Sequence, residues 1–293
     1  MSTIVITGCS SGFGLHGALA FARDGDTVYA TMRNLDKATR LLAIAESEGL
    51  QIHLKKLDVM QPETFTSVFD EILDETESID VLVNNAGILR AGAFEDLSEQ
   101  MFRDVLETNL IAPLLLSKAV LPYMRKQKSG YIIMISSLSG IAGLAGDVTY
   151  TASKFGLEGA TEALRHEVDR WGIKLALVEA GMYATGIMSP SMPDDSVLPD
   201  YYPQDSAYRP LIETNLEEMR RRMPEALDPA IVGNLLVEIA NSDGKQLRWP
   251  ADAVATMVLE KMFAQTDQER DTFLRDVSGS SWWSEGKDKG SSG

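Results

Sequence analysis

Short runs of Val, Ile and Leu alternate along this chain with longer stretches in which apolar residues recur every three or four positions. The short runs predict strands, and the longer stretches predict helices with one buried face. The predicted strands span residues 3–7, 27–31, 51–57, 80–83, 131–136, 174–178 and 246–249. The predicted helices span residues 15–23, 37–48, 62–76, 100–126, 150–170 and 229–241. This alternation predicts an α/β fold, a doubly wound parallel sheet of about seven strands with helices on both faces.

Two segments interrupt the alternation. Residues 186–227 are rich in proline, tyrosine and acidic residues and are too long for an ordinary connection, so we expect a functional insertion. Residues 278–293 are rich in Gly, Ser and Lys, which predicts a disordered tail in which Trp282 and Trp283 could still dock. Since no linker separates the remaining elements, residues 1–277 are expected to form a single domain.

Composition narrows the classes of function. The 293 residues are 44% hydrophobic and 24% charged, as in a globular protein with a sizeable core. Lys and Arg number 27 against 43 Asp and Glu, which gives a formal charge of −16. Phosphate backbones and anionic membrane surfaces repel so acidic a chain, so we expect no nucleic-acid partner.

Cysteine and histidine usage argues against a disulfide framework and a metal site. Cys9 is the single cysteine, and His16, His53 and His166 lack the spacing of metal ligands. No apolar run approaches the roughly 18 residues of a membrane span. The first residues also lack the basic region of a signal peptide. We therefore expect a cytoplasmic enzyme with no membrane span and no metal.

The sequence TGCSSGFG at residues 7–14 lies between the first predicted strand and the first predicted helix. Its glycines, Gly8, Gly12 and Gly14, permit a tight turn, and the helix directs its positive end toward the loop, which suits a pyrophosphate. A flexible Gly/Ser turn is the plainer alternative. The same letters also fit the G-x-S-x-G elbow of hydrolases. That interpretation is disfavoured because only seven residues precede Gly8, and His166 falls within a predicted helix.

The end of the second predicted strand bears on the choice of cofactor. Folds selective for NAD place Asp or Glu there to bind the adenosine ribose. This chain has Thr31 at that place and Arg33 two residues later. A guanidinium can hold a 2′-phosphate through two hydrogen bonds, so NADP(H) is favoured over NAD(H). The alternative is that Arg33 is an ordinary surface arginine.

A candidate catalytic group combines four residues from three predicted elements. Tyr150 and Lys154 are four residues apart and share one face of a predicted helix. Ser137 directly follows a strand, at the edge where a parallel sheet binds its ligands, and Asn109 lies in the preceding helix. Each residue alone could be structural. Together with the glycine loop they indicate an active site.

The ordered motifs TGCSSGFG (7–14), LDV (57–59), NNAG (84–87), Asn109, Ser137 and YTASK (150–154) resemble the short-chain dehydrogenase/reductase family to about residue 260. The stretches TGCSSGFGLH, VYATMRN and YTASKFGLEGATEALRHEV are most similar to its 17β-hydroxysteroid and retinol dehydrogenase-like branch. The resemblance implies a Rossmann-type sheet and hydride transfer between a nicotinamide cofactor and an alcohol or carbonyl compound.

The same resemblance implies a role for each catalytic residue. Tyr150 would be the general acid in reduction and the base in oxidation, with its phenolate stabilised by Lys154. Lys154 would also hold the nicotinamide ribose, Ser137 would bind the substrate oxygen, and Asn109 would fix a water molecule. The implied cofactor contacts are Gly8, Ser10, Ser11, Gly12, Phe13, Gly14, Arg33, Asp58, Val59, Asn85, Ala86, Gly87, Tyr150, Lys154, Gly181, Tyr183 and Thr185. Ala180 stands where many relatives have proline before Gly181.

In the family, the segment after Thr185 forms a lid, here about residues 186–227, over the substrate. It contains Met188, Met192, Tyr201, Tyr202 and Tyr208, so we expect a bulky, apolar substrate of steroid, retinoid or aromatic type, although these side chains could simply pack the loop. The resemblance also implies a homodimer or homotetramer. The alternatives are a non-catalytic dinucleotide sensor or scaffold, and a family member that reduces a conjugated double bond or acts as a dehydratase or epimerase.

Overall fold

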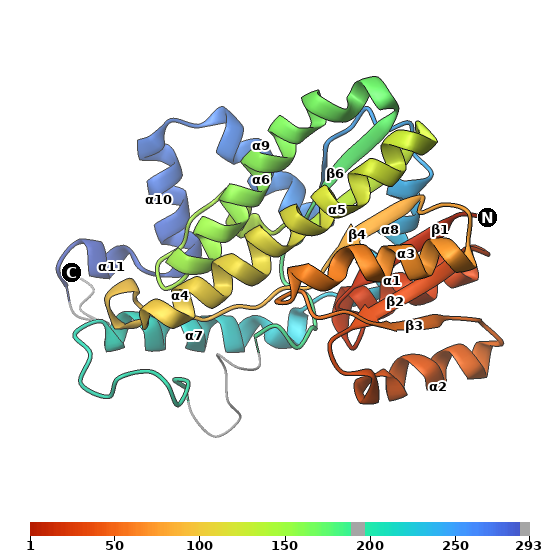
Figure 1. Cartoon of the computed structure of the whole chain (residues 1–293). Helices are drawn as coiled ribbons and strands as arrows, with labels where there is room; N and C mark the ends of the chain where they lie inside the picture. The colour runs from red at the N-terminus through yellow and green to blue at the C-terminus, as the bar shows by residue number, and fades with distance from the viewer. Residues whose placement is uncertain (189–196, 288–293) are drawn as a thin grey trace.

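A seven-stranded, all-parallel sheet forms the centre of the computed structural model, which describes residues 1–188 and 197–287 (Figure 1). The strands follow the order β3-β2-β1-β4-β5-β6-β7. Their bounds are Thr3–Thr7 (β1), Thr27–Met32 (β2), His53–Lys56 (β3), Val81–Asn84 (β4), Gly130–Ile135 (β5), Ile173–Glu179 (β6) and Arg248–Pro250 (β7). The predicted α/β, Rossmann-type sheet is therefore confirmed.

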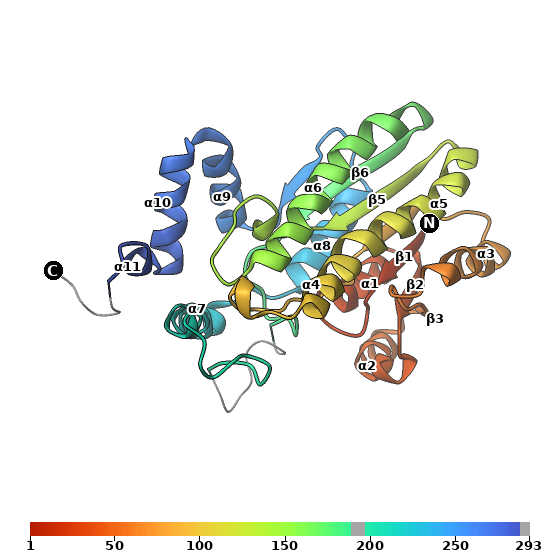
Figure 2. The same ribbon diagram turned by 60° about the vertical axis from the view of Figure 1, so that its left-hand side comes forward.

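Helices cover both faces of the sheet, and each face has its own hydrophobic core (Figure 2). On one face lie α1 (Gly12–Arg23), α2 (Thr39–Glu48) and α8 (Ala230–Ala240). On the other face lie α3 (Phe65–Glu75), α5 (Ala112–Gln127) and α6 (Val148–Val168). The five central strands, β2, β1, β4, β5 and β6, are almost wholly buried, which explains why they read as continuous apolar runs rather than as alternating patterns.

The strand order reverses between β1 and β4, which are neighbours in the sheet although two strands separate them in the sequence. A parallel sheet opens a crevice at such a switch point, beyond the carboxyl ends of the strands. The glycine loop follows β1, the NNAG motif follows β4 and Ser137 follows β5. All three motifs therefore meet at one edge of the sheet.

Residues 99–127 form one continuous helical stretch, as the sequence predicts for 100–126. It consists of α4 (Glu99–Leu106), a π-helical turn (Glu107–Ile111) and α5. By length and composition it is the one helix among the described residues that could cross a membrane, a test that a core helix also passes. Leu116, Val120 and Met124 are buried against the sheet. The expected absence of a membrane span stays a prediction.

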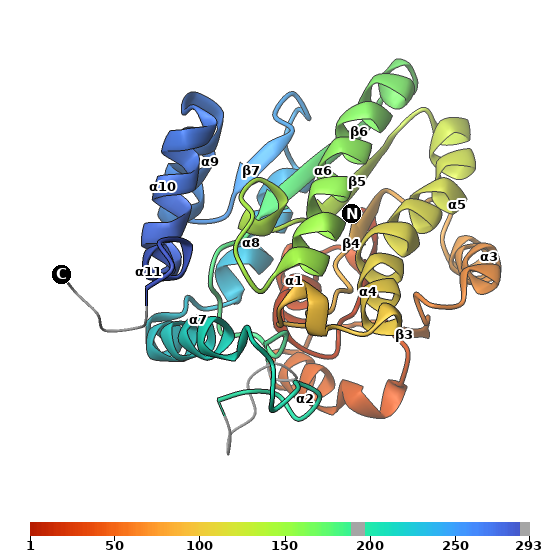
Figure 3. The same cartoon turned by 90° about the vertical axis from the view of Figure 1, so that its left-hand side faces the viewer.

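Four helices lie where the sequence predicts none: α7 (Arg209–Arg222), α9 (Ala253–Ala264), α10 (Asp267–Ser278) and α11 (Ser281–Ser284). Figure 3 shows α9, α10 and α11 grouped beyond β7, with α7 close to α11. Residues 278–287 form helix and turns, and the expected disorder of the tail stays a prediction. The Trp283 ring centroid lies 5.6 Å from that of Trp282 and 6.3 Å from that of Tyr208, so this segment docks on the lid. The last residues of the expected tail, 288–293, lie outside the described residues.

Candidate active site

The glycine loop between β1 and α1 has a backbone that only glycine accommodates. Gly8 and Gly12 have φ values of +74° and +54°, in the left-handed region. A Cβ at position 14 would lie 2.5 Å from Asn85 Nδ2 and 2.6 Å from the Gly8 carbonyl oxygen. α1 begins at Gly12 with no side-chain cap from Ser11 and no acidic residue in its first turn. Its N–H groups and its positive end therefore fit a pyrophosphate.

The NNAG motif holds this loop in place. Thr7 Oγ1 accepts hydrogen bonds from the backbone N–H groups of Asn85 (2.9 Å) and Ala86 (3.0 Å). Asn85 Nδ2 donates to the carbonyl oxygen of Thr7 at 2.7 Å. The Asn85 side chain, which the family resemblance implied to be a cofactor contact, is thus used to join the ends of β1 and β4. Thr7 is a positioning residue that sequence reasoning did not single out, although it immediately precedes the first glycine of the motif.

The residues expected near the adenosine ribose lie at the ends of neighbouring strands. Arg33 is exposed directly after β2, and Ser11 is exposed in the loop after β1. Among the described residues Arg33 has no ion-pair partner, so its guanidinium is available to a phosphate. Asp58 Oδ1 accepts from the Met60 N–H at 3.0 Å and fixes the turn after β3, with Val59 half-buried beside it.

The segment after β6 closes over the glycine loop from the other side. A Cβ at Gly12 would lie 3.3 Å from Thr185 Cβ, so the two segments touch. The Tyr183 ring packs edge-on against Phe13, with centroids 5.1 Å apart, and its hydroxyl donates to the Ala251 carbonyl at 3.0 Å. The structure therefore brings Phe13, Tyr183 and Thr185 together, and the Tyr183 side chain serves to anchor the segment.

Tyr150 and Lys154 lie on the same face of α6, as their spacing predicts, and both are buried. Lys154 Nζ lies 5.5 Å from the centroid of the Tyr150 ring and donates to the Ile135 carbonyl at 2.7 Å. Burial raises the pKa of Tyr150, the charge of Asp147 raises it further, and Ser137 lowers it. Burial lowers the pKa of Lys154 to about 8, against the opposing influence of the Glu158 carboxylate. Burial therefore brings the pKa of Lys154 toward neutral pH, whereas it moves the pKa of Tyr150 further above neutral pH.

Asn109 occupies the π-helical turn, a distortion that is frequent at functional sites. Its Oδ1 accepts from the Ile88 N–H at 2.9 Å, while Nδ2 donates to the Ile88 carbonyl at 2.8 Å and to Ser153 Oγ at 3.2 Å. Asn109 thus ties the NNAG segment, including the neighbouring Gly87, to the helix that carries Tyr150 and Lys154. The expected water-binding role stays a prediction.

Asp147 is a second residue that the sequence analysis missed. It immediately precedes α6 and stands one turn before Tyr150. Its Oδ2 accepts from Ser139 Oγ at 2.8 Å, while Oδ1 is buried without a hydrogen-bond partner. Burial raises the pKa of this carboxyl to about 7. An aspartate at the start of a helix is usually an N-cap, so the sequence position of Asp147 did not indicate a place in the active site.

The lid covers the Tyr150 side of the site with apolar and aromatic side chains. Tyr150 belongs to one buried cluster with Leu198, Tyr202 and Ile212. The lid is fastened by Ser206 Oγ, which donates to Asp96 Oδ2 at 2.6 Å, and by the Tyr202 hydroxyl, which donates to the same oxygen. Met192, named above for the lid, lies outside the described residues.

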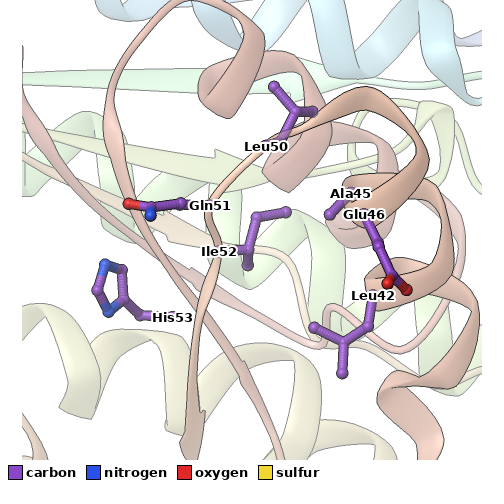
Figure 4. Close-up of a pocket in the computed structure, with 7 residues that line it drawn as sticks. All are labelled: Leu42, Ala45, Glu46, Leu50, Gln51, Ile52 and His53. Carbon is purple, nitrogen blue, oxygen red and sulfur yellow. The ribbon is translucent and has the colours of Figure 1, made fainter.

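A surface hollow of about 550 Å³ lies elsewhere, between α2 and the start of β3 (Figure 4). It is at the amino end of β3, whereas the glycine loop and Ser137 follow the carboxyl ends of their strands. It contains none of the expected site residues, being lined by Leu42, Ala45, Glu46, Leu50, Gln51, Ile52 and His53.

Comparisons with known proteins agree with this geometry. The family model described as short chain dehydrogenase matches residues 2–196. An uncharacterized oxidoreductase, YusZ, of Bacillus subtilis is 38% identical over 249 residues, which cover 84% of this chain and 87% of that protein. Human retinol dehydrogenase 8 is 40% identical over 187 residues, which cover 62% of this chain but only 59% of that protein.

A solved structure extends the likeness to almost the whole molecule. The short-chain dehydrogenase from Streptomyces avermitilis superposes with a TM-score of 0.75 at 29% identity, and the match covers 98% of each chain. It therefore includes the region beyond residue 196, where the family model ends. With the glycine loop, Ser137, Tyr150 and Lys154 gathered at one edge of the sheet, the chain belongs to the short-chain dehydrogenase family, whose members are oxidoreductases that use a nicotinamide dinucleotide.

Proposed function

We propose that this protein is an NADP(H)-dependent oxidoreductase that interconverts a primary or secondary alcohol with its aldehyde or ketone, with Tyr150 as the general acid and base. The observation that carries the proposal is the buried pair on α6, in which the Lys154 ammonium lies 5.5 Å from the Tyr150 ring. Ser137 faces this pair from the end of β5 and lowers the pKa of Tyr150. A sensor or scaffold would need none of these three groups.

The chemistry assigned to the protein is a proton transfer at one atom. In reduction, the Tyr150 hydroxyl donates its proton to the carbonyl oxygen of the substrate; in oxidation, the phenolate accepts the proton of the alcohol. Burial disfavours the phenolate, so the nearby Lys154 cation and a hydrogen bond from Ser137 are needed to stabilise it. When bound, the nicotinamide supplies or accepts the hydride.

Two exposed residues support the preference for NADP(H). Arg33 after β2 and Ser11 after β1 stand at the ends of paired strands, since Thr7 and Thr31 are partners in the register. A 2′-phosphate placed between them would accept hydrogen bonds from both side chains. An acidic residue, which would repel that phosphate, is absent from the end of β2.

The apolar cluster around Tyr150 supports a bulky, largely apolar substrate. The cluster contains three lid residues, Leu198, Tyr202 and Ile212, together with Leu89 from the loop after β4. Retinol, after which the 40% identical human retinol dehydrogenase 8 is named, has this character. The proposed substrate class therefore includes retinoid-, steroid- and aromatic-like alcohols and ketones.

We also propose a homodimer or homotetramer. Three apolar side chains are each exposed by 38 to 42%: Ile111 in the π-helical turn, which packs against α6, and Val148 and Phe155 on α6. Apolar side chains gathered on packed helices are typical of subunit contacts. The molar mass in solution, measured by light scattering, tests this directly.

The test of function compares the wild-type protein with Tyr150→Phe. Tryptophan fluorescence, titrated with NADPH and separately with NADH, measures cofactor binding, and turnover of bulky ketones measures the reaction. We expect tighter binding of NADPH in both proteins. Turnover should fall by about 10²-fold or more in the variant, because the proton donor is lost while the aromatic ring at this expected cofactor contact is kept.

Each outcome of this test has a definite meaning. Undiminished turnover in Tyr150→Phe would remove Tyr150 from the mechanism. Tighter binding of NADH would reject the role of Arg33 while leaving the reaction class intact. Reduction of a conjugated double bond, with the carbonyl retained in the product, would assign the chain to another reaction of the family.

A further inference from the structure

Two glutamates are buried directly behind the catalytic pair, and the proposed reaction uses neither. Glu158 lies on α6, one turn after Lys154, and is 4% exposed. Glu179 ends β6 and is fully buried. Carboxylates are almost never buried to this degree unless they are paired with a cation. Their presence therefore calls for a physical reason.

The partner cation is Arg248, which belongs to β7. Its Nε donates to Glu158 Oε2 at 3.1 Å and lies 3.9 Å from Glu179 Oε1. Its Nη2 donates to Glu162 Oε2 at 3.0 Å, on the exposed next turn of α6. One guanidinium thus faces three carboxyl groups, so it cannot neutralise all of them.

Several oxygen atoms in this cluster are buried without a hydrogen-bond partner: Glu158 Oε1, Ser136 Oγ and both carboxyl oxygens of Glu179. Gly140 leaves the space for two of them, because a Cβ there would lie 2.6 Å from Ser136 Oγ and 3.1 Å from Glu158 Oε1. Ser136 directly follows Ile135, whose carbonyl accepts from Lys154 Nζ. The unpaired oxygen of Glu158 therefore lies beside the end of β5 that also binds the lysine.

The charges of the cluster are distributed unequally. Burial raises the pKa of Glu179 to about 8, and the charge of Glu158 adds to this rise, so Glu179 is mainly protonated at neutral pH. Burial also raises the pKa of Glu158, but Ser136, Arg248 and Lys154 all favour its ionised form. Glu158 in turn opposes the effect of burial on the pKa of Lys154. The negative charge of the pair thus resides on the glutamate nearer to the lysine.

We propose that Glu158 is a positioning residue for the catalytic pair: its carboxylate, held by Arg248, supplies the counter-charge that keeps the Lys154 ammonium protonated beside Tyr150. Glu179 is the protonated member of the two glutamates and leaves the negative charge to Glu158. Only one part of this inference rests on the proposed function, namely that the charge of Lys154 affects turnover. The charge relation itself can be measured without any substrate.

The experiment follows the titration of Lys154 by NMR in protein labelled with ¹³C and ¹⁵N at lysine, with its signal assigned by its absence from Lys154→Arg. In Glu158→Gln, we expect the midpoint to fall by about one pH unit, because an opposite charge has been removed. The matched control is Glu162→Gln, which also loses a hydrogen bond to Arg248 but is more than half exposed, and whose midpoint should not move.

Two further variants keep the test decisive if Glu158→Gln fails to fold. Arg248→Gln should lower the midpoint of Lys154 as well, because Glu158 then takes up a proton and loses its charge. Glu179→Gln should leave the Lys154 signal unchanged at and below pH 7, because in that range it replaces a protonated carboxyl with a neutral amide of similar shape. The pH profile of ketone reduction should follow the NMR midpoints, with Glu158→Gln about fivefold slower than wild type at pH 8 and equal to it at pH 6.

The outcomes separate this proposal from the proposed function. A Lys154 titration that is the same in Glu158→Gln and wild type overturns the charge relation, whether or not ketones are reduced. An equal shift in Glu162→Gln also overturns it, because the effect would then come from surface charge in general. A shift in Glu158→Gln that is absent from Glu162→Gln, in a protein without carbonyl activity, supports the charge relation and rejects the proposed function instead.

Discussion

The cofactor side and the substrate side of the crevice are built in different ways. On the cofactor side, the backbone sets the geometry. Two glycines have positive φ, α1 begins inside the loop, and Thr7 accepts hydrogen bonds from the backbone N–H groups of the two residues that follow β4. On the substrate side, the geometry is set by contacts between side chains that are far apart in the sequence. Tyr202 reaches Asp96, 106 residues away, and Tyr208 reaches Glu95, 113 residues away.

This difference suggests which half of the molecule can diverge. The glycine loop has almost no space for an added atom. The side-chain contacts of the lid, in contrast, can be changed by substituting a few residues. The family model ends at residue 196, before α7 and the helices beyond β7. The identity with human retinol dehydrogenase 8 likewise covers 62% of this chain. The family model therefore includes the glycine loop, Ser137, Tyr150 and Lys154, but neither α7 nor the helices beyond β7.

The largest effect is expected from Gly14→Ala on the cofactor side. The added Cβ would meet Asn85 Nδ2 at 2.5 Å and the Gly8 carbonyl at 2.6 Å, so the loop must move. We expect cofactor affinity, measured by fluorescence titration, to fall by about 100-fold, and stability to fall by about 1–3 kcal/mol in denaturant unfolding.

The control for this variant is Gly159→Ala on α6. Gly159 lies within the helix, and a Cβ there would have no neighbour within 4 Å. Alanine should therefore leave cofactor binding unchanged and stabilise the protein by about 0.5–1 kcal/mol. If Gly14→Ala bound the cofactor as well as Gly159→Ala does, the cofactor side would not be set by its backbone.

A smaller effect is expected from Asp96→Ala on the substrate side. Tyr202 and Ser206 would both lose their acceptor, so the lid would loosen over Tyr150. We expect KM for a bulky ketone to rise by about tenfold, equivalent to about 1.4 kcal/mol, with cofactor affinity unchanged. Glu95→Ala is the matched control, because it removes one exposed bond to Tyr208 and should change KM much less. An equal rise in KM in the two variants would show that Asp96 does not fasten the lid.

The smallest effect on the reaction is expected from Asp147→Asn, at a residue that immediately precedes the helix of Tyr150. Its pKa is raised to about 7 by burial, so ionisation destabilises the folded protein as the pH rises from about 4 through 7. The variant should therefore gain Tm relative to wild type above pH 7, and the difference should vanish below pH 4.

The same variant should also change the pH profile of the reaction. Asp147 raises the pKa of Tyr150, so its removal should start the rise in alcohol oxidation at a lower pH, by less than about one unit. A pH profile identical to that of the wild type would show that Asp147 has no electrostatic influence on Tyr150. A Tm gain that persisted at pH 4 would show that its effect on stability is not one of charge.

The fold and the centre of the site could be predicted because their signals are local. β1, the glycine loop and α1 are consecutive, and the helical period alone places Tyr150 and Lys154 on one face. Among the missed helices, α10 lacks such a signal because it has no buried residue and so shows no apolar stripe. In contrast, α9 buries Ala255, Val258 and Met262 at helical spacing. Finer cues were nevertheless present, namely Pro210 at the start of α7 and the Thr266–Glu269 capping box of α10.

The sequence by itself determined the parallel sheet, the glycine loop and the Tyr150–Lys154 spacing. The pattern that predicts each of these features is contained within a few consecutive residues. Only the tertiary structure decided that Asp147 faces Tyr150 and that Glu158, Glu179 and Arg248 share one buried cluster. Those contacts arise because α6 packs on the sheet and β7 pairs with β6. Burial then changes the charge of a carboxyl group, and neither its partners nor its depth can be known until the chain has folded.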